Sequence, residues 1–410
     1  GSSACGSGGS AGAKGVQRSA WPKMPSAAPE KPMLPKLPIG GTEESWLQKD
    51  LRGLTDIIRH WTSIFLICVP VGYAAKYLEW NALAIFSLNF FGILALANII
   101  YMAIDAVASN TGPRIGGLIE AFFGKTVEQV MAVQCMKANL PSVLKSNLMG
   151  SLHWCMCLVL GMSLFAAGMK SRSATFDKNE ASAQMTCQIV ASISVVLPTM
   201  FKSVPGVTEE HILLLSRVCA FGIISTYVAF LYFHLWTHAP ETSSTAEIKH
   251  TQLTTGTSVA LLVSSVVLST ECSQQLVDTI GDVSDQCSIP LEFIGAGLLP
   301  IIGNTAEHVA SVTNARAGNL SAAISIAVGS ATQIALFVVP LAVLWGWAFG
   351  SPFTLSFREF DATVMLLTCF LCAQVLQHGQ TNWLHGAMLM VAYGLVVIIT
   401  WHMPREGYRD

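Results

Sequence analysis

Charged residues are scarce in this sequence. Asp, Glu, Lys and Arg make up 12% of its 410 residues, against about 25% in a typical soluble domain. The formal net charge is −2, so no basic surface for nucleic acid is indicated. The zinc-protease motif HExxH is absent, as is any zinc-type cluster of Cys and His beside the acidic residues. These absences argue against a soluble domain, a nucleic-acid-binding protein and an intramembrane metalloprotease, and we expect the protein not to be an enzyme.

Long apolar runs make up much of the sequence instead. The chain is 52% hydrophobic, and its apolar runs approach or reach the ~20 residues that a membrane-spanning helix needs. A helix is the only open-chain structure that satisfies its own backbone in lipid. We therefore predict an all-α polytopic membrane protein with about eleven transmembrane helices. The candidate spans are residues 61–78, 80–104, 114–137, 143–168, 184–201, 211–237, 253–273, 291–315, 320–349, 361–377 and 383–402.

The eleven cysteines do not indicate a disulfide framework. Most lie inside apolar runs, where a cysteine usually serves as a small packing residue. The CxxC pair has no second Cys or His pair nearby, so it is a weak indication of a metal site. The cysteines interpreted as packing residues are Cys68, Cys135, Cys155, Cys157, Cys219, Cys369 and Cys372.

Composition divides the chain into four parts. Residues 1–45 are rich in Gly, Ser, Ala and Pro, which cannot bury a core, and are predicted to be disordered. Their basic residues, with no acidic residue before Glu30, are compatible with a targeting segment; a plain disordered tail fits equally well. Residues 46–237 form the first half, 238–252 a polar cytosolic linker, and 253–403 the second half.

The two halves repeat each other. "GKTVEQV" at 124–130 returns as "GNTAEHV" at 303–309, an offset of 179 residues. Because the two glutamates of these motifs lie five spans apart, an odd number, the copies are expected to cross the membrane in opposite directions. Inverted repeats of this kind are typical of secondary transporters, whose substrate site lies near the midplane between the repeats. The same offset relates Gly124 to Gly303, Thr126 to Thr305, Glu128 to Glu307, Gly150 to Gly329 and Ser151 to Ser330.

The paired glutamates suggest a cation site. A carboxylate at the bilayer centre costs roughly 2.5–3.5 kcal/mol, and two of them repel unless a cation or protons lie between them. Ca²⁺ takes oxygen ligands only, and Asn304, Ser330 and Gln333 supply such oxygens near Glu307. The glycines at 124, 150, 303 and 329 allow another helix to approach closely.

Several neighbouring residues have a structural interpretation as well. Thr126 and Thr305 are more often packing residues than ligands. His308 follows Glu307 directly and so points about 100° away around the helix; packing is its default role and proton relay the alternative. Glu120 lies eight residues before Glu128 and is expected to line the pathway without joining the coordination shell.

The sequence resembles the cation/proton exchanger family, the Ca²⁺/H⁺ antiporters. The resemblance covers residues ~60–403 and is carried by "FIGAGLLPIIGNTAEHVASV", "VGSATQIALFVVPLAVLWGW", "LQHGQTNWLHGAMLMVAYG" and "LPSVLKSNLMGS". It implies eleven helices, as two inverted five-helix repeats plus an extra mobile N-terminal helix. It also implies a site that takes Ca²⁺ or protons alternately, without a cofactor. Carried over, that site comprises Glu128, Glu307, Asn304, Ser330 and Gln333, and its ion path includes Ser151 and Glu271.

The departures from the family pattern are concentrated in the first repeat. The family has Asn where this chain has Lys125, and an ammonium cannot coordinate a cation. In the next span a small polar Ser-Asn pair of the family has become Trp154-Cys155. Lys125 stands one turn from Glu128, so an ion pair between them is expected.

Three functions are therefore left open. The first is exchange of Ca²⁺ for protons. The second is exchange of a monovalent or transition-metal cation for protons. The third is a non-transporting or regulatory homologue in which Lys125 is the resident cation. The resemblance implies a vacuolar or other acidic compartment, with an organelle envelope as an alternative. The expected partners are the bilayer, the cation and protons; a homo-oligomer is left open.

Overall fold

The structure is a computed structural model that describes residues 46–171, 173–237 and 253–403. The predicted N-terminal segment 1–45 and the predicted linker 238–252 lie outside the described residues. The described chain is almost entirely helical, as predicted. The exception is a pair of two-residue antiparallel strands, β1 (Ala174–Thr175) and β2 (Gln380–Thr381), which joins a connection of the first half to one of the second.

The first half contains α-helices, one 3₁₀ segment (η1) and two π-helical segments (η2 and η3). Asn81 caps α3 by accepting a hydrogen bond from the backbone N–H of Leu83 at 3.2 Å, and a proline opens both α4 and α6. In chain order the elements are α1 (Trp46–Arg59), η1 (Trp61–Ile67), α2 (Cys68–Tyr77), α3 (Ala82–Thr111), α4 (Pro113–Phe123), α5 (Thr126–Lys137), α6 (Pro141–His153), η2 (Trp154–Val159), α7 (Leu160–Lys170), α8 (Lys178–Phe201), α9 (Glu209–Tyr232) and η3 (Phe233–Thr237).

The second half is also built almost entirely of helices. Its π-helical segments are η4 and η5, and Asn382 caps α17 through bonds from Leu384 and His385. The elements are α10 (Thr255–Asp278), α11 (Ile280–Cys287), α12 (Leu291–Phe293), η4 (Ile294–Leu298), α13 (Leu299–Ala317), α14 (Leu320–Gln333), η5 (Ile334–Val338), α15 (Val339–Ala348), α16 (Glu359–Leu376) and α17 (Trp383–Trp401).

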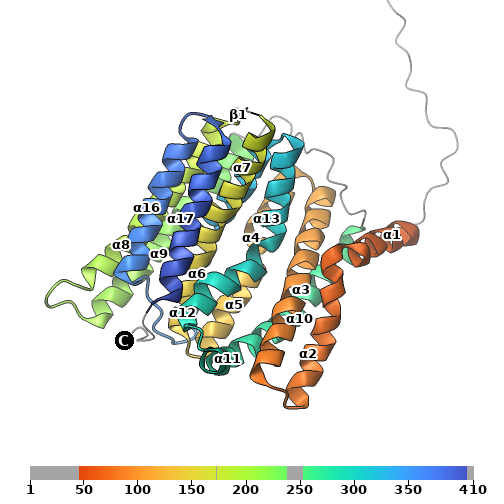
Figure 1. The fold of residues 1–410 in the computed structure, drawn as a ribbon, viewed down its shortest axis with the longest axis horizontal. Helices are drawn as coiled ribbons and strands as arrows, with labels where there is room; N and C mark the ends of the chain where they lie inside the picture. Colours follow the sequence, from red (N-terminus) through yellow and green to blue (C-terminus); the bar gives the residue numbers. More distant parts are fainter. Residues whose placement is uncertain (1–45, 172, 238–252, 404–410) are drawn as a thin grey trace, which may run out of the picture. The chain divides into compact units, whose positions relative to one another are not determined.

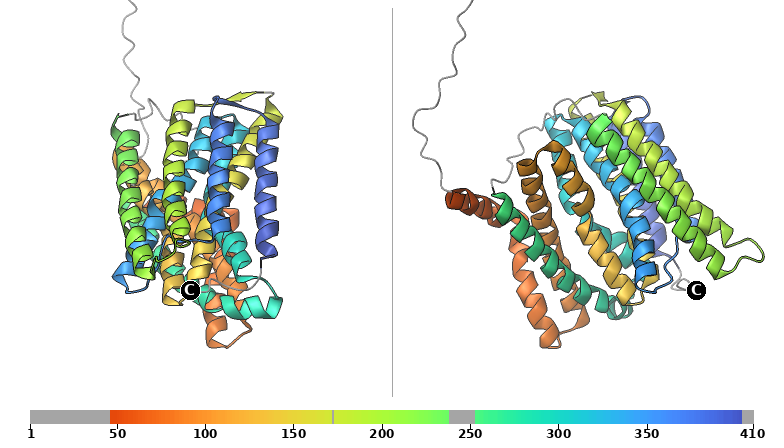
Figure 2. Two further views of the ribbon diagram at one scale, coloured as in Figure 1. Left: turned by 90° about the vertical axis from the view of Figure 1, so that its left-hand side faces the viewer. Right: turned by 180° about the vertical axis from the view of Figure 1, so that it is seen from behind.

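The helices pack in two groups with the motif-bearing helices between them (Figures 1 and 2). On one side α10 lies along α3, and α2 packs on α3 as well. On the other side α17 packs on α7 and α16 on α8. Between them, α13 contacts α3, α6, α7 and α14, so it touches both groups. A helix that contacts both groups is well placed to respond to movement of one against the other.

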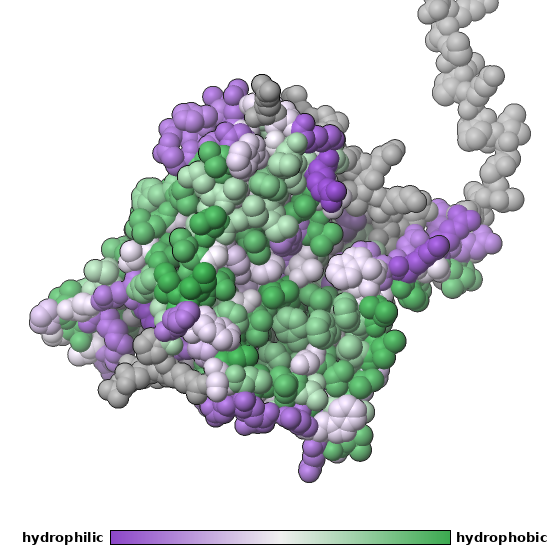
Figure 3. All heavy atoms as spheres, in the orientation of Figure 1, coloured by the Kyte–Doolittle hydropathy of each residue, from purple (hydrophilic) through white to green (hydrophobic). Residues whose placement is uncertain are grey.

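The outer faces of the helices are apolar. In Figure 3 hydrophobic side chains cover the middle of the molecule, and hydrophilic ones gather toward its two ends. Large apolar side chains such as Val263 on α10 and Leu395 on α17 are exposed, which in a water-soluble protein would be costly over so large an area. The protein is therefore an integral membrane protein.

Fewer than eleven uninterrupted spans are found. Among the described residues, eight helices are long and apolar enough to cross a membrane, or nine if the bent pair Leu47–Arg59 and Trp61–Tyr77 is one span. The predicted spans 114–137 and 291–315 are not among them. The first is divided into α4 and α5 at Gly124–Lys125, whereas the second runs without a gap through α12, η4 and α13, with a π-helical segment in it. The segment that carries Glu128 is thus discontinuous, which is common where a transporter builds its ion site. The count of eleven stays a prediction.

The internal repeat is preserved in the backbone. The π-helical segment η2 at residues 154–159 corresponds, at the offset of 179, to η5 at residues 334–338. Both follow helices that carry site candidates, Ser151 on α6 and Ser330 on α14. Single π turns often mark functional sites. That the two copies run in opposite directions stays a prediction.

Candidate cation site

The two glutamates of the repeat face each other across the contact between α5 and α13. Glu128 lies in the first turn of α5 and is 3% exposed. Gly303 of α13 makes this approach feasible, because a Cβ there would lie 2.7 Å from the carboxylate carbon of Glu128. The side chain of Glu307, one turn further along α13, is 13% exposed. Two carboxylates from opposite halves of the chain are thereby brought to one buried place.

Lys125 lies between them. It is the residue that precedes α5, and its side chain is 1% exposed. Its ammonium Nζ lies 2.8 Å from Glu307 Oε1 and 3.3 Å from Glu128 Oε1. The expected pair with Glu128 is therefore present, but the shorter contact is to the glutamate of the other half. Sequence spacing alone could not have found that second contact.

Asn304 links the ammonium to the rest of the site. Its side-chain oxygen Oδ1 accepts a hydrogen bond of 2.9 Å from Lys125 Nζ and one of 3.2 Å from the thiol of Cys155. The Ser330 hydroxyl lies 3.5 Å from the same oxygen. The amide nitrogen donates to the Pro300 carbonyl at 3.0 Å and to the Ser151 hydroxyl at 3.4 Å. Fully buried, Asn304 connects α5, α6, η2 and α14.

Cys155 is more than a packing residue. Besides its bond to Asn304, its sulfur lies 3.4 Å from Ser330 Oγ. By the resemblance described above, the family has a small polar residue at this position. That difference in the sequence could have indicated that the thiol of Cys155 joins the polar network. The other described cysteines are also free; Cys369, for example, lies 2.9 Å from the Ser192 hydroxyl.

Gln333 and the glycines lie near this centre. The side-chain oxygen of Gln333 would lie 3.3 Å from a Cβ on Gly124, but the nearest atom there is the Glu120 carbonyl of the preceding turn. At Gly150 a Cβ would collide with the backbone of Ala296. At Gly329 the nearest atom, Nε2 of Gln184, lies 3.6 Å from where a Cβ would stand. A close approach of helices therefore requires glycine at Gly150 and Gly303, whereas Gly329 has room for a methyl group.

The remaining candidates lie outside the Lys125 network. The hydroxyl of Thr126 bonds to the Phe123 carbonyl, and that of Thr305 to the Ile301 carbonyl, so each serves its own local backbone. His308 Nε2 lies 3.1 Å from the Met162 sulfur, consistent with packing toward α7. Glu120 on α4 and Glu271 on α10 are exposed, and neither takes part in the ion pairs around Lys125.

The chemistry available here is that of oxygen ligands. In the part of the chain that the structure describes, no group of three or more His, Cys, Asp or Glu side chains is gathered as a metal cluster. A cation at this place would rely on two carboxylates and on neutral oxygens from amides and hydroxyls, a set that suits Ca²⁺ or another hard cation.

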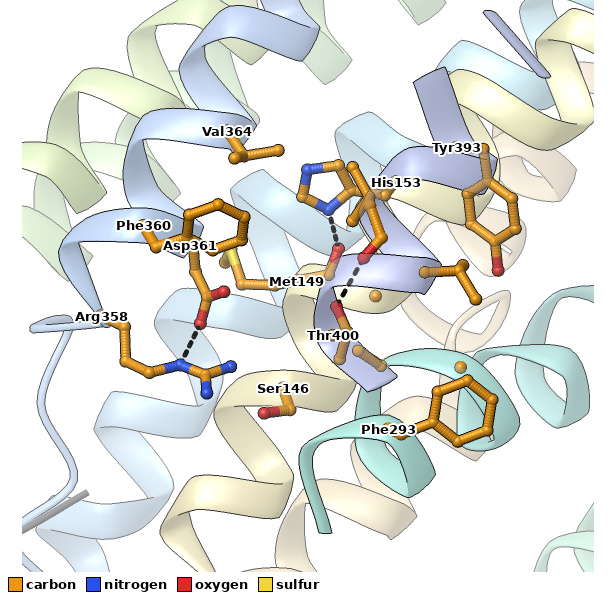
Figure 4. A pocket seen from close by; sticks show the side chains of 15 residues that line it. Ser146, Met149, His153, Phe293, Arg358, Phe360, Asp361, Val364, Tyr393 and Thr400 are labelled. Atoms are coloured by element: carbon orange, nitrogen blue, oxygen red, sulfur yellow. Dashed lines mark hydrogen bonds and ion pairs between the residues drawn. The ribbon is translucent and has the colours of Figure 1, made fainter. Parts of the chain in front are cut away.

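A separate small pocket opens between α6, α16 and α17, beside η4 (Figure 4). Arg358 and Asp361 at its edge form an ion pair of 2.8 Å. The buried His153 ring donates from Nδ1 to the Met149 carbonyl at 2.7 Å. Neither Glu128 nor Glu307 borders this pocket, so it is distinct from the cation site.

Comparison with known proteins places this arrangement in a family. Residues 81–236 and 257–402, one stretch in each half, match the family described as sodium/calcium exchanger protein. The chain belongs to this exchanger family. Because the family matches twice, the internal repeat seen in the sequence is a property of the family, and the resemblance to exchangers is confirmed.

Individual members of the exchanger family support this assignment. The chain is 31% identical to a vacuolar calcium ion transporter of Schizosaccharomyces pombe over 84% of its own length and 85% of the relative's. It is 30% identical to a Ca²⁺/H⁺ antiporter of Synechocystis, covering 83% of the chain and 97% of the relative. The structure of native YfkE superimposes with a TM-score of 0.73 at 28% identity, over 83% of this chain and 100% of that one. An H⁺/Ca²⁺ exchanger, CAX, has a TM-score of 0.69 at 13% identity over 86% and 89%, which shows a shared fold.

Proposed function

We propose that this protein exchanges Ca²⁺, or a related metal cation, for protons across a membrane by alternating access. The observation that carries the proposal is the convergence of Glu128 and Glu307, one from each repeat, beside the buried amide of Asn304. Family membership supports it, and relatives whose names specify Ca²⁺ and H⁺ make Ca²⁺ the first candidate.

The proposed ligands are the carboxylates of Glu128 and Glu307 together with the oxygens of Asn304, Ser330 and Gln333. Deprotonated carboxylates bind the cation, and protonation cancels their charge and releases it. Cation and protons thus compete for the same oxygens, which couples their movement in opposite directions. No covalent chemistry is involved, so the protein works as a transporter and needs no cofactor.

Access to the site alternates when one group of helices shifts against the other. The break at Gly124–Lys125 leaves Glu128 in the first turn of the short helix α5, which can reorient without disrupting a long helix. We place the protein in a vacuolar or similar acidic membrane, because relatives carry vacuolar names and an acidic lumen supplies the driving protons.

The test is uptake of radioactive Ca²⁺ into vesicles that hold the purified full chain and an acidic interior. Uptake that a protonophore abolishes supports Ca²⁺/H⁺ exchange. Proton-coupled uptake of K⁺, Na⁺ or Mn²⁺ without Ca²⁺ uptake would favour an exchanger for another cation. A folded protein that moves none of these ions would contradict the proposal and favour a regulatory homologue.

A further inference from the structure

The ammonium of Lys125 uses the same oxygens that the proposed function gives to the transported cation. A lysine ammonium has three N–H donors and no acceptor. Three side-chain oxygens surround it: Glu307 Oε1 at 2.8 Å, Asn304 Oδ1 at 2.9 Å and Glu128 Oε1 at 3.3 Å. The positive charge of the side chain therefore occupies the centre of the site.

The ammonium is tethered to the site by the side chain of Lys125 itself. Lys125 directly precedes α5, and its side chain, 1% exposed, crosses to α13. In the second half the equivalent position holds Asn304, which is a cation ligand by the proposed function. One repeat thus contributes a neutral ligand at this position and the other contributes a cation.

We propose that Lys125 is a tethered competitor for the cation position and sets how tightly the site binds a cation. This inference rests on the proposed function. An arriving cation must displace an ammonium whose effective concentration, fixed by its tether, is on the order of millimolar or higher. A dilute cation therefore succeeds only if the carboxylates attract it more strongly than they attract the ammonium.

Every cation must displace the same ammonium. Lys125 therefore lowers the affinity of the site for every cation by the same factor. While the ammonium fills the site, excess K⁺ has little effect on Ca²⁺ binding; once the charge of Lys125 is removed, K⁺ competes with Ca²⁺ directly.

The structure also retains unused acceptors for the incoming ion. Oε2 of Glu128 and Oε2 of Glu307 are buried and accept no hydrogen bond from the described residues. When the ammonium withdraws, these oxygens and the three that surrounded it, Glu307 Oε1, Asn304 Oδ1 and Glu128 Oε1, are free to coordinate one cation.

The test compares the wild type with Lys125→Asn, which copies the other repeat, and with Lys125→Met, which removes the charge without adding a ligand. Lys125→Arg is the control that keeps a positive charge. Ca²⁺ binding to the purified full chain is measured by isothermal titration calorimetry with and without excess K⁺, and thermal unfolding checks that each variant folds.

We expect Lys125→Asn to bind Ca²⁺ at least about tenfold more tightly than the wild type and to become sensitive to K⁺. Lys125→Met should also bind Ca²⁺ more tightly and become sensitive to K⁺, and Lys125→Arg should bind Ca²⁺ no more tightly than the wild type. Unchanged affinity and unchanged K⁺ sensitivity in both folded neutral variants would overturn the inference. So would a wild type that binds no Ca²⁺ while Lys125→Asn does, because the ammonium could then not be displaced.

The vesicle assay separates this inference from the proposed function. If the wild type and Lys125→Asn both exchange Ca²⁺ for protons with the same dependence on Ca²⁺ concentration, the exchange function stands and only the role of Lys125 fails. If neither protein moves any cation although both fold, the proposed function itself fails.

Discussion

Lys125 donates a 2.9 Å hydrogen bond to the side chain of Asn304, the residue at its own position in the other repeat. The two motifs therefore meet at the very position where their sequences differ most in charge. The same ammonium lies 2.8 Å from Glu307, so the first repeat holds the carboxylate of the second.

Gly303 is expected to be essential for the geometry of the site. A Cβ at this position would lie 2.7 Å from the Glu128 carboxylate carbon, so Gly303→Ala must push Glu128 away from α13. We expect Ca²⁺ affinity to fall by about tenfold, equivalent to about 1.4 kcal/mol. Calorimetry on the purified protein measures it.

Gly329→Ala is the matched control for that substitution. The nearest atom there lies 3.6 Å from the added carbon, so near-normal Ca²⁺ binding is expected. Equal binding by the two alanine variants would show that the close approach at Gly303 is not needed.

Cys155 is expected to act through its hydrogen bond to Asn304 Oδ1, which is 3.2 Å long. Cys155→Ser keeps a donor of similar size and should retain Ca²⁺ binding. Cys155→Ala removes the donor, and loss of one hydrogen bond costs about 0.5–1.5 kcal/mol, a several-fold loss of affinity. If Ala and Ser at this position give the same binding constant, the thiol is only a packing group.

The repeat and its chemistry could be recognised in the sequence, because a constant offset and two glutamates in apolar surroundings are visible without a structure. Most predicted spans coincide with helices: the interval 383–402, for example, corresponds to α17, Trp383–Trp401, whereas the interval 114–137 is divided into α4 and α5. The ends of these helices are marked by residues such as Asn81 and Asn382, whose capping role depends only on neighbours along the chain.

Contacts between distant segments could not be predicted in the same way. Helical spacing pairs Lys125 with Glu128, but the approach to Glu307 depends on how α5 packs against α13. The sequence also did not lead us to predict α1 as a helix of its own, although Leu47, Leu51 and Ile58 recur on one exposed face of it. Its docking partner lies about two hundred residues away in the sequence, where Asp50 meets Thr254.

Asp50 is expected to secure the start of α10. Its carboxylate accepts hydrogen bonds from the backbone N–H of Thr254 at 2.7 Å and from the Thr257 hydroxyl at 2.8 Å. Replacing it with Ala removes a capping group from another helix, at a cost of about 1 kcal/mol. A lower thermal unfolding temperature in detergent should result, whereas Lys49→Ala, on the exposed side of α1, should leave that temperature unchanged.

The contribution of Asp50 has a definite pH dependence. Burial favours a higher pKa for this carboxyl, but the hydrogen bonds from Thr254 and Thr257 outweigh it and hold the pKa below its ordinary value. The stabilisation is therefore complete above the ordinary pKa of about 3.9 and is lost as pH falls through the lowered value. Between pH 5 and pH 8 the stability difference between wild type and Asp50→Ala should stay constant. A difference that disappears already at pH 6 would contradict this.

The central claim is that Glu307 binds the cation and the proton in turn. Glu307→Gln keeps the volume and the hydrogen-bonding capacity of the side chain but removes its charge and its titratable proton. Thr305→Val on the same helix is the control, because the Thr305 hydroxyl bonds only within α13. The decisive measurement is Ca²⁺ uptake driven by a proton gradient in vesicles that contain each variant. The account predicts uptake by the wild type and by Thr305→Val, and none by a folded Glu307→Gln. Wild-type uptake by Glu307→Gln would contradict it.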